Sequence, residues 1–206
     1  MDKDKSFQVS NSSVFDMYLS TIKTCRTAAA AKELACSFYE MEFAEPDIFM
    51  VGDKTTSYFI EAYGGKVVCI ERKNGFFAST NHFRMIYGGV PYNKNHSTFL
   101  RLNRAEQILQ SKPDLDGTGD VLRDKYYGET VWSVCRYPKY AVAGAEEAYY
   151  TQAAVIFTMT NTTIVCEYVL NGNASVPRVG MRWEPFASER PPARVEYIGR
   201  LSNLKI

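Results

Sequence analysis

Apolar side chains recur at helical spacing near the start of the chain, and this pattern predicts a pair of helices. The run 10–13 (Ser-Asn-Ser-Ser) offers capping side chains to a first helix in which Phe15, Leu19 and Ile22 share one face. Thr27 caps a second helix, where small and apolar residues again recur at helical spacing. The residues of that second stripe are Ala28, Ala31, Leu34, Ala35 and Phe38.

After residue 46 the pattern changes to short runs of β-branched and aromatic residues separated by turn signals such as Gly64-Gly65 and Asn74-Gly75. This pattern predicts an antiparallel meander, followed by helices. The predicted strands are 47–51, 56–63, 66–72 and 76–79, and the predicted helices are 97–109 and 120–126.

Further short runs predict a second group of strands, at 131–136, 151–158, 164–170 and 179–183. Residues 1–9 and 186–206 are predicted to be irregular, because the first are polar and charged and the second contain Pro191-Pro192. With no internal repeat and no recognisable linker, residues 1–206 are expected to form a single domain. The order of helix pair, meander, helices and hairpin predicts an α+β class built mainly from antiparallel sheets with flanking helices.

Composition limits the possible partners. The chain has 206 residues, of which 46% are hydrophobic, and its net charge is +1. Such a balance provides no overall field to recruit nucleic acid or an anionic membrane. Since no apolar run approaches the length of a membrane span and no signal-type segment follows Met1, we expect a cytoplasmic protein.

The cysteines and histidines do not form a pattern typical of a metal site. Five cysteines are scattered in apolar surroundings, which favours reduced and mostly buried thiols over a disulfide framework. His82 and His96 have no Cys or carboxylate at ligand spacing, so no metal is expected, and no motif implies a cofactor. His82 is expected to orient the turn in which it lies.

The segment Ser79-Thr80-Asn81-His82-Phe83 is the main candidate for chemistry, because it places a cluster of hydrogen-bonding side chains at the end of a predicted strand. An Asn amide held rigidly in a dry pocket donates hydrogen bonds that stabilise an oxyanion. The structural alternative is that Thr80 and Asn81 only close a turn through local bonds to the backbone.

Three stretches carry a resemblance to a known family: Ile48-Phe49-Met50-Val51-Gly52-Asp53, Phe59-Ile60-Glu61 and Phe77 through Phe83. Ser133-Val134-Cys135-Arg136 and Ala153-Ala154-Val155-Ile156-Phe157 follow in the same order. Over residues 10–172 the chain thereby resembles the acyl-coenzyme A:6-aminopenicillanic-acid acyltransferase family. These are N-terminal nucleophile hydrolases, in which a self-cleaved precursor exposes a terminal cysteine that attacks an amide.

This resemblance implies an αββα sandwich and gives roles to particular residues. It makes Asn81 a catalytic oxyanion-hole donor, and it gives Arg136 the role of binding a substrate carboxylate, for which a guanidinium fork is suited. A surface ion pair is the alternative for Arg136. Thr151 is a weaker candidate for the site, because a packing role explains its position equally well. The Tyr-Tyr pairs at 126–127 and 149–150 either line an acyl pocket or belong to the hydrophobic core.

The chain departs from the family at the nucleophile. Family members carry their cysteine before the segment that residues 10–40 resemble, and we find no counterpart here. The resemblance therefore implies an incomplete sandwich, the C-terminal part of a larger unit, which is either a truncated gene product or one piece of a split enzyme whose nucleophile half lies on a separate chain. Cleavage before Cys25 would create a terminal cysteine within this chain, but a small buried hydrophobe is the usual role of a cysteine beside an apolar helix face.

Two functions remain open from the sequence. The first is the C-terminal portion of an amide (C–N bond) hydrolase or acyltransferase, inactive alone, acting on a small acyl-amide substrate that is peptide-like, acyl-amino or a lactam. The second is a non-catalytic binding or interaction module on the same scaffold, in which Asn81 is structural.

Overall fold

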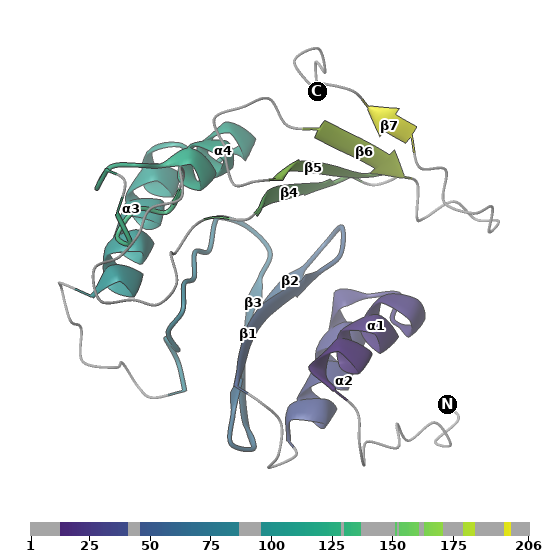
Figure 1. The fold of residues 1–206 in the computed structure, drawn as a ribbon. Helices are drawn as coiled ribbons and strands as arrows, with labels where there is room; N and C mark the ends of the chain where they lie inside the picture. Colours follow the sequence, from purple (N-terminus) through teal and green to yellow (C-terminus); the bar gives the residue numbers. More distant parts are fainter. Residues whose placement is uncertain are drawn as a thin grey trace. The chain divides into compact units, whose positions relative to one another are not determined.

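The computed structural model describes residues 13–40, 46–86, 96–128, 130–136, 151, 153–160, 163–170, 179–183 and 196–198. The chain divides into two compact units, Met1–Asn74 with Phe83–Pro91 and Gly75–His82 with Tyr92–Ile206. Each unit combines helices with an antiparallel sheet, which confirms the α+β class (Figure 1). The sequence pattern, which shows no linker, did not predict this division.

The first unit contains the predicted helix pair and the first three predicted strands. The strands form a sheet in the order β1-β2-β3, with antiparallel pairing throughout. Both glycines of the β2–β3 turn, Gly64 and Gly65, have positive φ angles of 55° and 75°, as the tight turn of a two-residue hairpin requires. The elements are α1 (Val14–Thr24), α2 (Ala28–Tyr39), β1 (Asp47–Gly52), β2 (Ser57–Tyr63) and β3 (Lys66–Arg72).

Both helices begin at the predicted caps. Ser13 accepts a hydrogen bond from the backbone N–H of Asp16, whose carboxylate accepts one from the N–H of Ser13 in return. Thr27 likewise accepts from the N–H of Ala30. Local side-chain chemistry therefore fixes where each helix starts.

The face of α1 that Phe15, Leu19 and Ile22 share is exposed, with exposed fractions of 75%, 50% and 80%. Met17 is buried instead, at 1%. Tyr18, next to Met17, faces the sheet as well, and its ring contacts that of Phe49 on β1 at a centroid distance of 5.7 Å. The side of α1 that carries Met17 and Tyr18 is therefore the side that packs. Apolar spacing alone does not distinguish these two faces of the helix.

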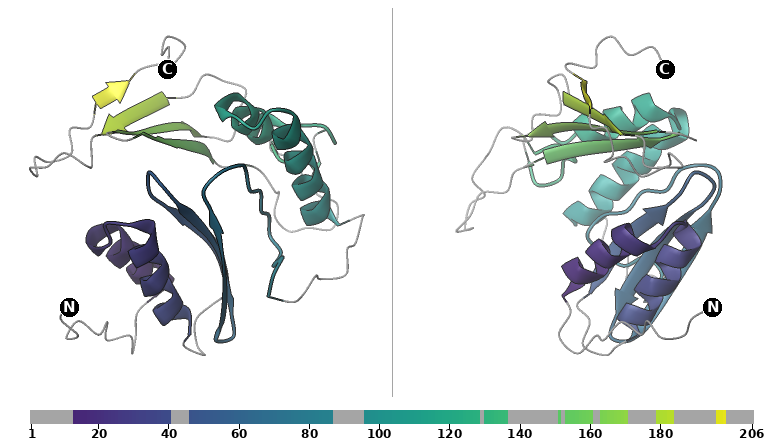
Figure 2. Two further views of the ribbon diagram at one scale, coloured as in Figure 1. Left: turned by 180° about the vertical axis from the view of Figure 1, so that it is seen from behind. Right: turned by 90° about the vertical axis from the view of Figure 1, so that its right-hand side faces the viewer.

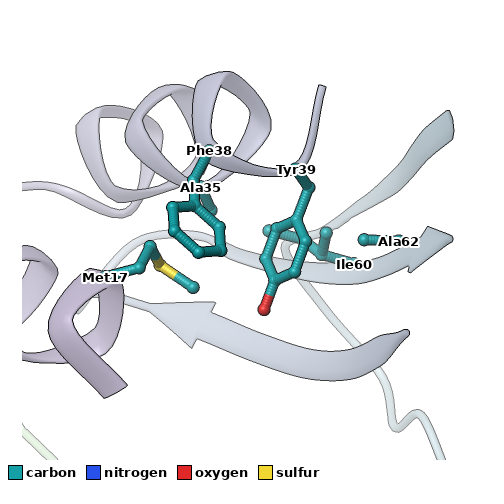
Figure 3. Close-up of a cluster of buried hydrophobic side chains, with 6 residues drawn as sticks. All are labelled: Met17, Ala35, Phe38, Tyr39, Ile60 and Ala62. Carbon is teal, nitrogen blue, oxygen red and sulfur yellow. The ribbon is translucent and has the colours of Figure 1, made fainter. Parts of the chain in front are cut away.

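Helices α1 and α2 lie against one face of the sheet (Figure 2), and the buried side chains between them form the core cluster of the first unit (Figure 3). The face is selected by the alternation along β2, where Ile60 and Ala62 point toward the helices. The cluster consists of Met17, Ala35, Phe38, Tyr39, Ile60 and Ala62.

One carboxylate joins both helices to β1. Asp47 accepts hydrogen bonds from the hydroxyls of Tyr18 on α1 and Tyr39 on α2. Burial, together with this carboxylate, raises the pKa of Tyr18 to about 12 and also raises that of Tyr39. Both phenols therefore stay protonated, and keep donating to Asp47, well above neutral pH.

On the opposite face of β2, Glu61 is fully buried. Its carboxylate accepts three backbone N–H bonds, from Arg84 at 2.6 Å, Met85 at 2.8 Å and Ile86 at 3.2 Å. The Glu61 carboxylate therefore accepts the hydrogen bonds that the backbone N–H groups of loop 84–86 would otherwise make within a helix or sheet. These bonds also offset the free-energy cost of burying the carboxylate.

Asp53 lies between β1 and β2, and its carboxylate is hydrogen-bonded to the first turn of α2. It accepts from the N–H of Ala28 at 2.8 Å and from Thr55 and Thr56 in its own turn. The Ala28 N–H bond is the largest cause that lowers the pKa of Asp53 from 3.8 to about 2. The folded state therefore binds this proton less readily than the unfolded state does.

Asp53→Asn is expected to lower the free energy of unfolding by about 1 kcal/mol at neutral pH, because the amide keeps only one of the two oxygens that accept from Ala28, Thr55 and Thr56 and removes a negative charge at a helix N-terminus. Because the folded pKa is depressed, the contribution of the carboxylate is present above about pH 4 and is lost as pH falls toward about 2. Urea unfolding of both proteins at pH 7, 4 and 2 tests this. A stability difference that stays constant down to pH 2 would contradict it.

The second unit contains a four-stranded sheet of order β4-β5-β6-β7, and its helices include α4, which contacts β4. The predicted strands 151–158, 164–170 and 179–183 and the predicted helix 97–109 are confirmed with small shifts of their ends. The elements are α3 (Ser97–Ser111), α4 (Leu115–Arg123), β4 (Ala153–Met159), β5 (Ile164–Leu170), β6 (Val179–Trp183) and β7 (Glu196–Ile198).

Two predictions around α3 and α4 are wrong. Residues 76–79 form no strand, since the chain that follows them is hydrogen-bonded to α3 instead. The second helix occupies Leu115–Arg123 rather than 120–126, because Asp114 caps it by accepting from the N–H of Gly117 at 2.8 Å.

Two further predictions are also wrong. Residues 131–136 form turns and bends, held by local bonds such as the one that Ser133 donates to the carbonyl of Gly128. Strand β7 lies inside 186–206, which was expected to be irregular, and pairs with β6. The rest of that tail and residues 1–9 lie outside the described residues. Among the described helices, none is both long and apolar enough to cross a membrane.

Candidate functional site

Asn81 lies just beyond segment 75–80 and is fixed to the first turn of α3. Its backbone N–H donates to the hydroxyl of Thr98 at 3.1 Å. The same hydroxyl lies 2.7 Å from that of Thr80 and 2.9 Å from Nδ1 of His82. Because Thr98 is buried, these contacts form a satisfied polar cluster that sets the backbone position of Asn81.

The side chain of Asn81 is oriented by an arginine. Nη2 of Arg101, on α3, donates to Oδ1 of Asn81 at 2.9 Å, and Nε of Arg101 donates to the carbonyl of Ser97 at 3.3 Å. Since a guanidinium only donates, it fixes the amide oxygen and directs the amide NH2 group away from itself. An oriented NH2 group is the donor that an oxyanion requires.

Asn81 is nevertheless exposed in this structure. A hydrogen-bond donor stabilises a developing charge most strongly where water is excluded, because water otherwise screens it and competes for the charge. The structure thus orients the Asn81 amide but does not shield it from water. A bound substrate or another segment would have to exclude the water.

His82 packs beside this cluster. Its ring lies 4.3 Å from that of Phe99, measured between centroids, while Nδ1 faces Thr98. This placement agrees with a role in orienting the turn. Within the described ranges, no three or more metal-ligating side chains gather at one point.

An open groove of about 640 Å³ lies within the second unit, between segment 75–79, α3, α4 and β4. Its wall is mainly apolar, with Phe77, Leu109 and Phe157 among the lining side chains. Ser79 lines it two residues before Asn81. The size falls within the range typical of small-molecule sites, roughly 300–1,000 Å³.

One residue that lines the groove carries a buried polar atom. The hydroxyl oxygen of Thr158, on β4, is buried and finds no hydrogen-bond partner among the described residues. A buried hydroxyl without a partner costs free energy.

Arg136 and Thr151 are brought together by the fold. The backbone N–H of Arg136 donates to the Thr151 hydroxyl at 2.8 Å, and the Thr151 N–H donates to the carbonyl of Arg136 at 2.9 Å. The Arg136 guanidinium donates to the carbonyl of Val131 at 2.8 Å. None of these bonds joins Arg136 to Asn81. A guanidinium has five N–H donors, more than the Val131 carbonyl uses, so the predicted role of Arg136 in binding a substrate carboxylate stays a prediction.

The cysteines do not supply an exposed nucleophile to the second unit. Its two cysteines, Cys135 and Cys166, are both buried. Burial also raises the pKa of Cys166 and so favours its neutral, unreactive thiol. Cys25, Cys36 and Cys69 belong to the first unit.

Sequence reasoning missed Thr98 and Arg101, the two residues that fix Asn81. Both lie near the start of α3, 17 and 20 positions after Asn81. A Thr and an Arg in the first turns of a helix are common, so no local signal identified their partner. Comparison with protein-family models, curated proteins and solved structures found no match to this chain.

Proposed function

We propose that this chain is the C-terminal portion of an amide hydrolase or acyltransferase of the N-terminal nucleophile type, with a cysteine nucleophile that is not among these 206 residues and that a separate polypeptide can supply in trans. The observation that carries the proposal is the Asn81 amide. Its oxygen is held by Arg101, so that its NH2 group is oriented, and it follows a segment that lines a largely apolar groove. The resemblance of residues 10–172 to the acyltransferase family supports the same assignment.

In this proposal the groove holds the acyl part of a small amide substrate, and the incoming nucleophile attacks the carbonyl carbon. The carbonyl oxygen then gains negative charge, which the Asn81 NH2 group stabilises by donating a hydrogen bond. The leaving amine takes up the proton that the attacking thiol loses as the C–N bond breaks. Water, or an acceptor amine in the transfer reaction, then cleaves the resulting thioester and restores the thiol. Arg136 would bind a carboxylate of the substrate through the guanidinium donors that Val131 does not use.

The exposure of Asn81 sets a requirement for a split enzyme, and the elements of the two units support one. Asn81 is exposed, so a second polypeptide would supply the cover that excludes water as well as the nucleophile. Each unit pairs an antiparallel sheet with helices, which are the elements that an αββα sandwich needs. We therefore propose an incomplete sandwich of that type.

A non-catalytic binding module is the second candidate, and the exposure of Asn81 favours it. In that case the Asn81–Arg101 hydrogen bond only fastens segment 75–82 to α3, and the groove binds its ligand without reaction. The two candidates differ in whether adding a nucleophile creates turnover.

Hydrolysis of a chromogenic acyl anilide tests the proposal. The chain alone is expected to be inactive, and activity is expected when it is mixed with the polypeptide encoded beside it, if that polypeptide exposes a terminal cysteine. Turnover by the chain alone, or an intact-mass species beginning at Cys25, would contradict a nucleophile in trans. A stable complex without turnover would favour the binding module.

A further inference from the structure

Cys36 and Cys69 lie side by side in the first unit, although 33 positions separate them in the sequence. Cys36 is on α2 and Cys69 is on β3, and their sulfur atoms are 3.6 Å apart. Both residues are partly exposed, in contrast to the buried Cys135 and Cys166. This contact joins the helix layer directly to the sheet.

We propose that Cys36 and Cys69 form a redox-active dithiol that closes reversibly to a disulfide and thereby fastens α2 to β3. A disulfide has a sulfur–sulfur distance of about 2.05 Å, so the two atoms, already in contact, must approach by roughly 1.5 Å. Side-chain rotation supplies movements of this size. Partial exposure gives an oxidant access to the pair.

The surroundings distinguish the two thiols. Burial, followed by the hydrogen bond with Cys36, raises the pKa of Cys69 to about 12. Cys69 is therefore the poorer first nucleophile.

With oxidised glutathione as the oxidant, the steps balance as follows. The Cys36 thiolate attacks one sulfur of the glutathione disulfide, forming a mixed disulfide and releasing one glutathione thiolate. The Cys69 thiol loses its proton as it attacks the Cys36 sulfur, which releases the second glutathione thiolate. Both released thiolates take up protons. Two protein thiols are oxidised and one glutathione disulfide is reduced.

The disulfide would restrict the unfolded chain across β1, β2 and their turns. Closing a loop of this length removes conformational entropy from the unfolded state, so the oxidised protein is expected to melt higher by on the order of 10 °C. Reduction would release this restraint. The proposal is independent of the proposed amide chemistry, because it concerns only thiols of the first unit.

The test equilibrates the full chain with mixtures of reduced and oxidised glutathione, traps free thiols by alkylation and maps disulfide-linked peptides by mass spectrometry. The expected product is a Cys36–Cys69 cross-link that dithiothreitol reverses. Cys25→Ser serves as the matched control, because Cys25 is the other partly exposed cysteine of the first unit, and it should leave the yield unchanged.

The order of attack is tested in the single variants. Cys69→Ser should accumulate glutathione on Cys36, whereas Cys36→Ser should leave Cys69 largely unmodified. A native chain that forms no Cys36–Cys69 link under conditions that glutathionylate Cys25 would overturn the proposal. So would a cross-link yield no higher than that of the urea-unfolded chain, since the folded geometry is what should favour this pair.

Discussion

Replacement of Glu61 by alanine is expected to lower the free energy of unfolding of the first unit by about 3 kcal/mol or more, because it leaves three buried N–H donors without an acceptor. Each unsatisfied donor costs roughly 1–3 kcal/mol, and an alanine also leaves a cavity beside β2. A loss of this size is a large part of the stability of an ordinary domain, about 5–15 kcal/mol.

Hydrogen exchange of peptides from β1–β3 and from segment 84–86 measures this effect where it should occur. Glu61→Gln is expected to fall between the wild type and Glu61→Ala, because the amide keeps the volume but replaces one accepting oxygen by a donor. Glu71→Ala is the matched control. It removes an exposed carboxylate of β3 that, among the described residues, pairs with Lys73, and it should change stability by less than about 0.5 kcal/mol.

If Glu61→Ala exchanged no faster than the wild type at residues 84–86, the carboxylate would not be what holds this segment. A selective increase there, larger than in peptides of the second unit, would assign the effect to the three hydrogen bonds rather than to general unfolding.

Asn81→Ala is expected to lower the turnover number of the reconstituted enzyme by roughly a hundredfold or more, because it removes the proposed oxyanion donor. KM should change little, since the donor acts on charge that develops after the substrate has bound. Steady-state kinetics with the acyl anilide, at a fixed concentration of the nucleophile-bearing chain, separates the two parameters.

Two variants accompany that measurement. Arg101→Met keeps the Asn81 amide but removes the bond that orients it, so a smaller fall in turnover is expected. Asn74→Ala changes another exposed asparagine, at the turn after β3, and should leave turnover unchanged. Wild-type turnover in Asn81→Ala would make the oxyanion role untenable and would favour a purely structural Asn81.

Elements with strong local signals were predictable from the sequence. Ser13 and Thr27 start their helices by bonding backbone groups only three positions away, and Gly64-Gly65 supplies the positive φ angles of its hairpin without help from distant residues. The wrong secondary-structure predictions occurred where other hydrogen bonds outweighed the preference indicated by the local sequence pattern. Residues 131–136 resemble a strand in composition, but nearby side-chain bonds hold them in turns.

The candidate site was only half predictable, since the sequence identified Asn81 and not the residues that hold it. Contacts between residues far apart in the sequence decide two features that local patterns left open: how Asn81 is held, and which face of α1 is buried. Thr98 and Arg101 position Asn81 across a gap of 17 to 20 residues, and Asp47 selects the face of α1 that is buried by binding Tyr18.

The sequence by itself determined the α+β class, the starts of α1 and α2 and the first three strands, because these depend on spacing and on bonds between near neighbours. Only the tertiary structure decided that Glu61 is buried under three backbone donors, that Cys36 contacts Cys69 and that segment 75–82 joins α3. Such pairings depend on how distant elements pack, and residues far apart in the chain carry no local signal of their partners.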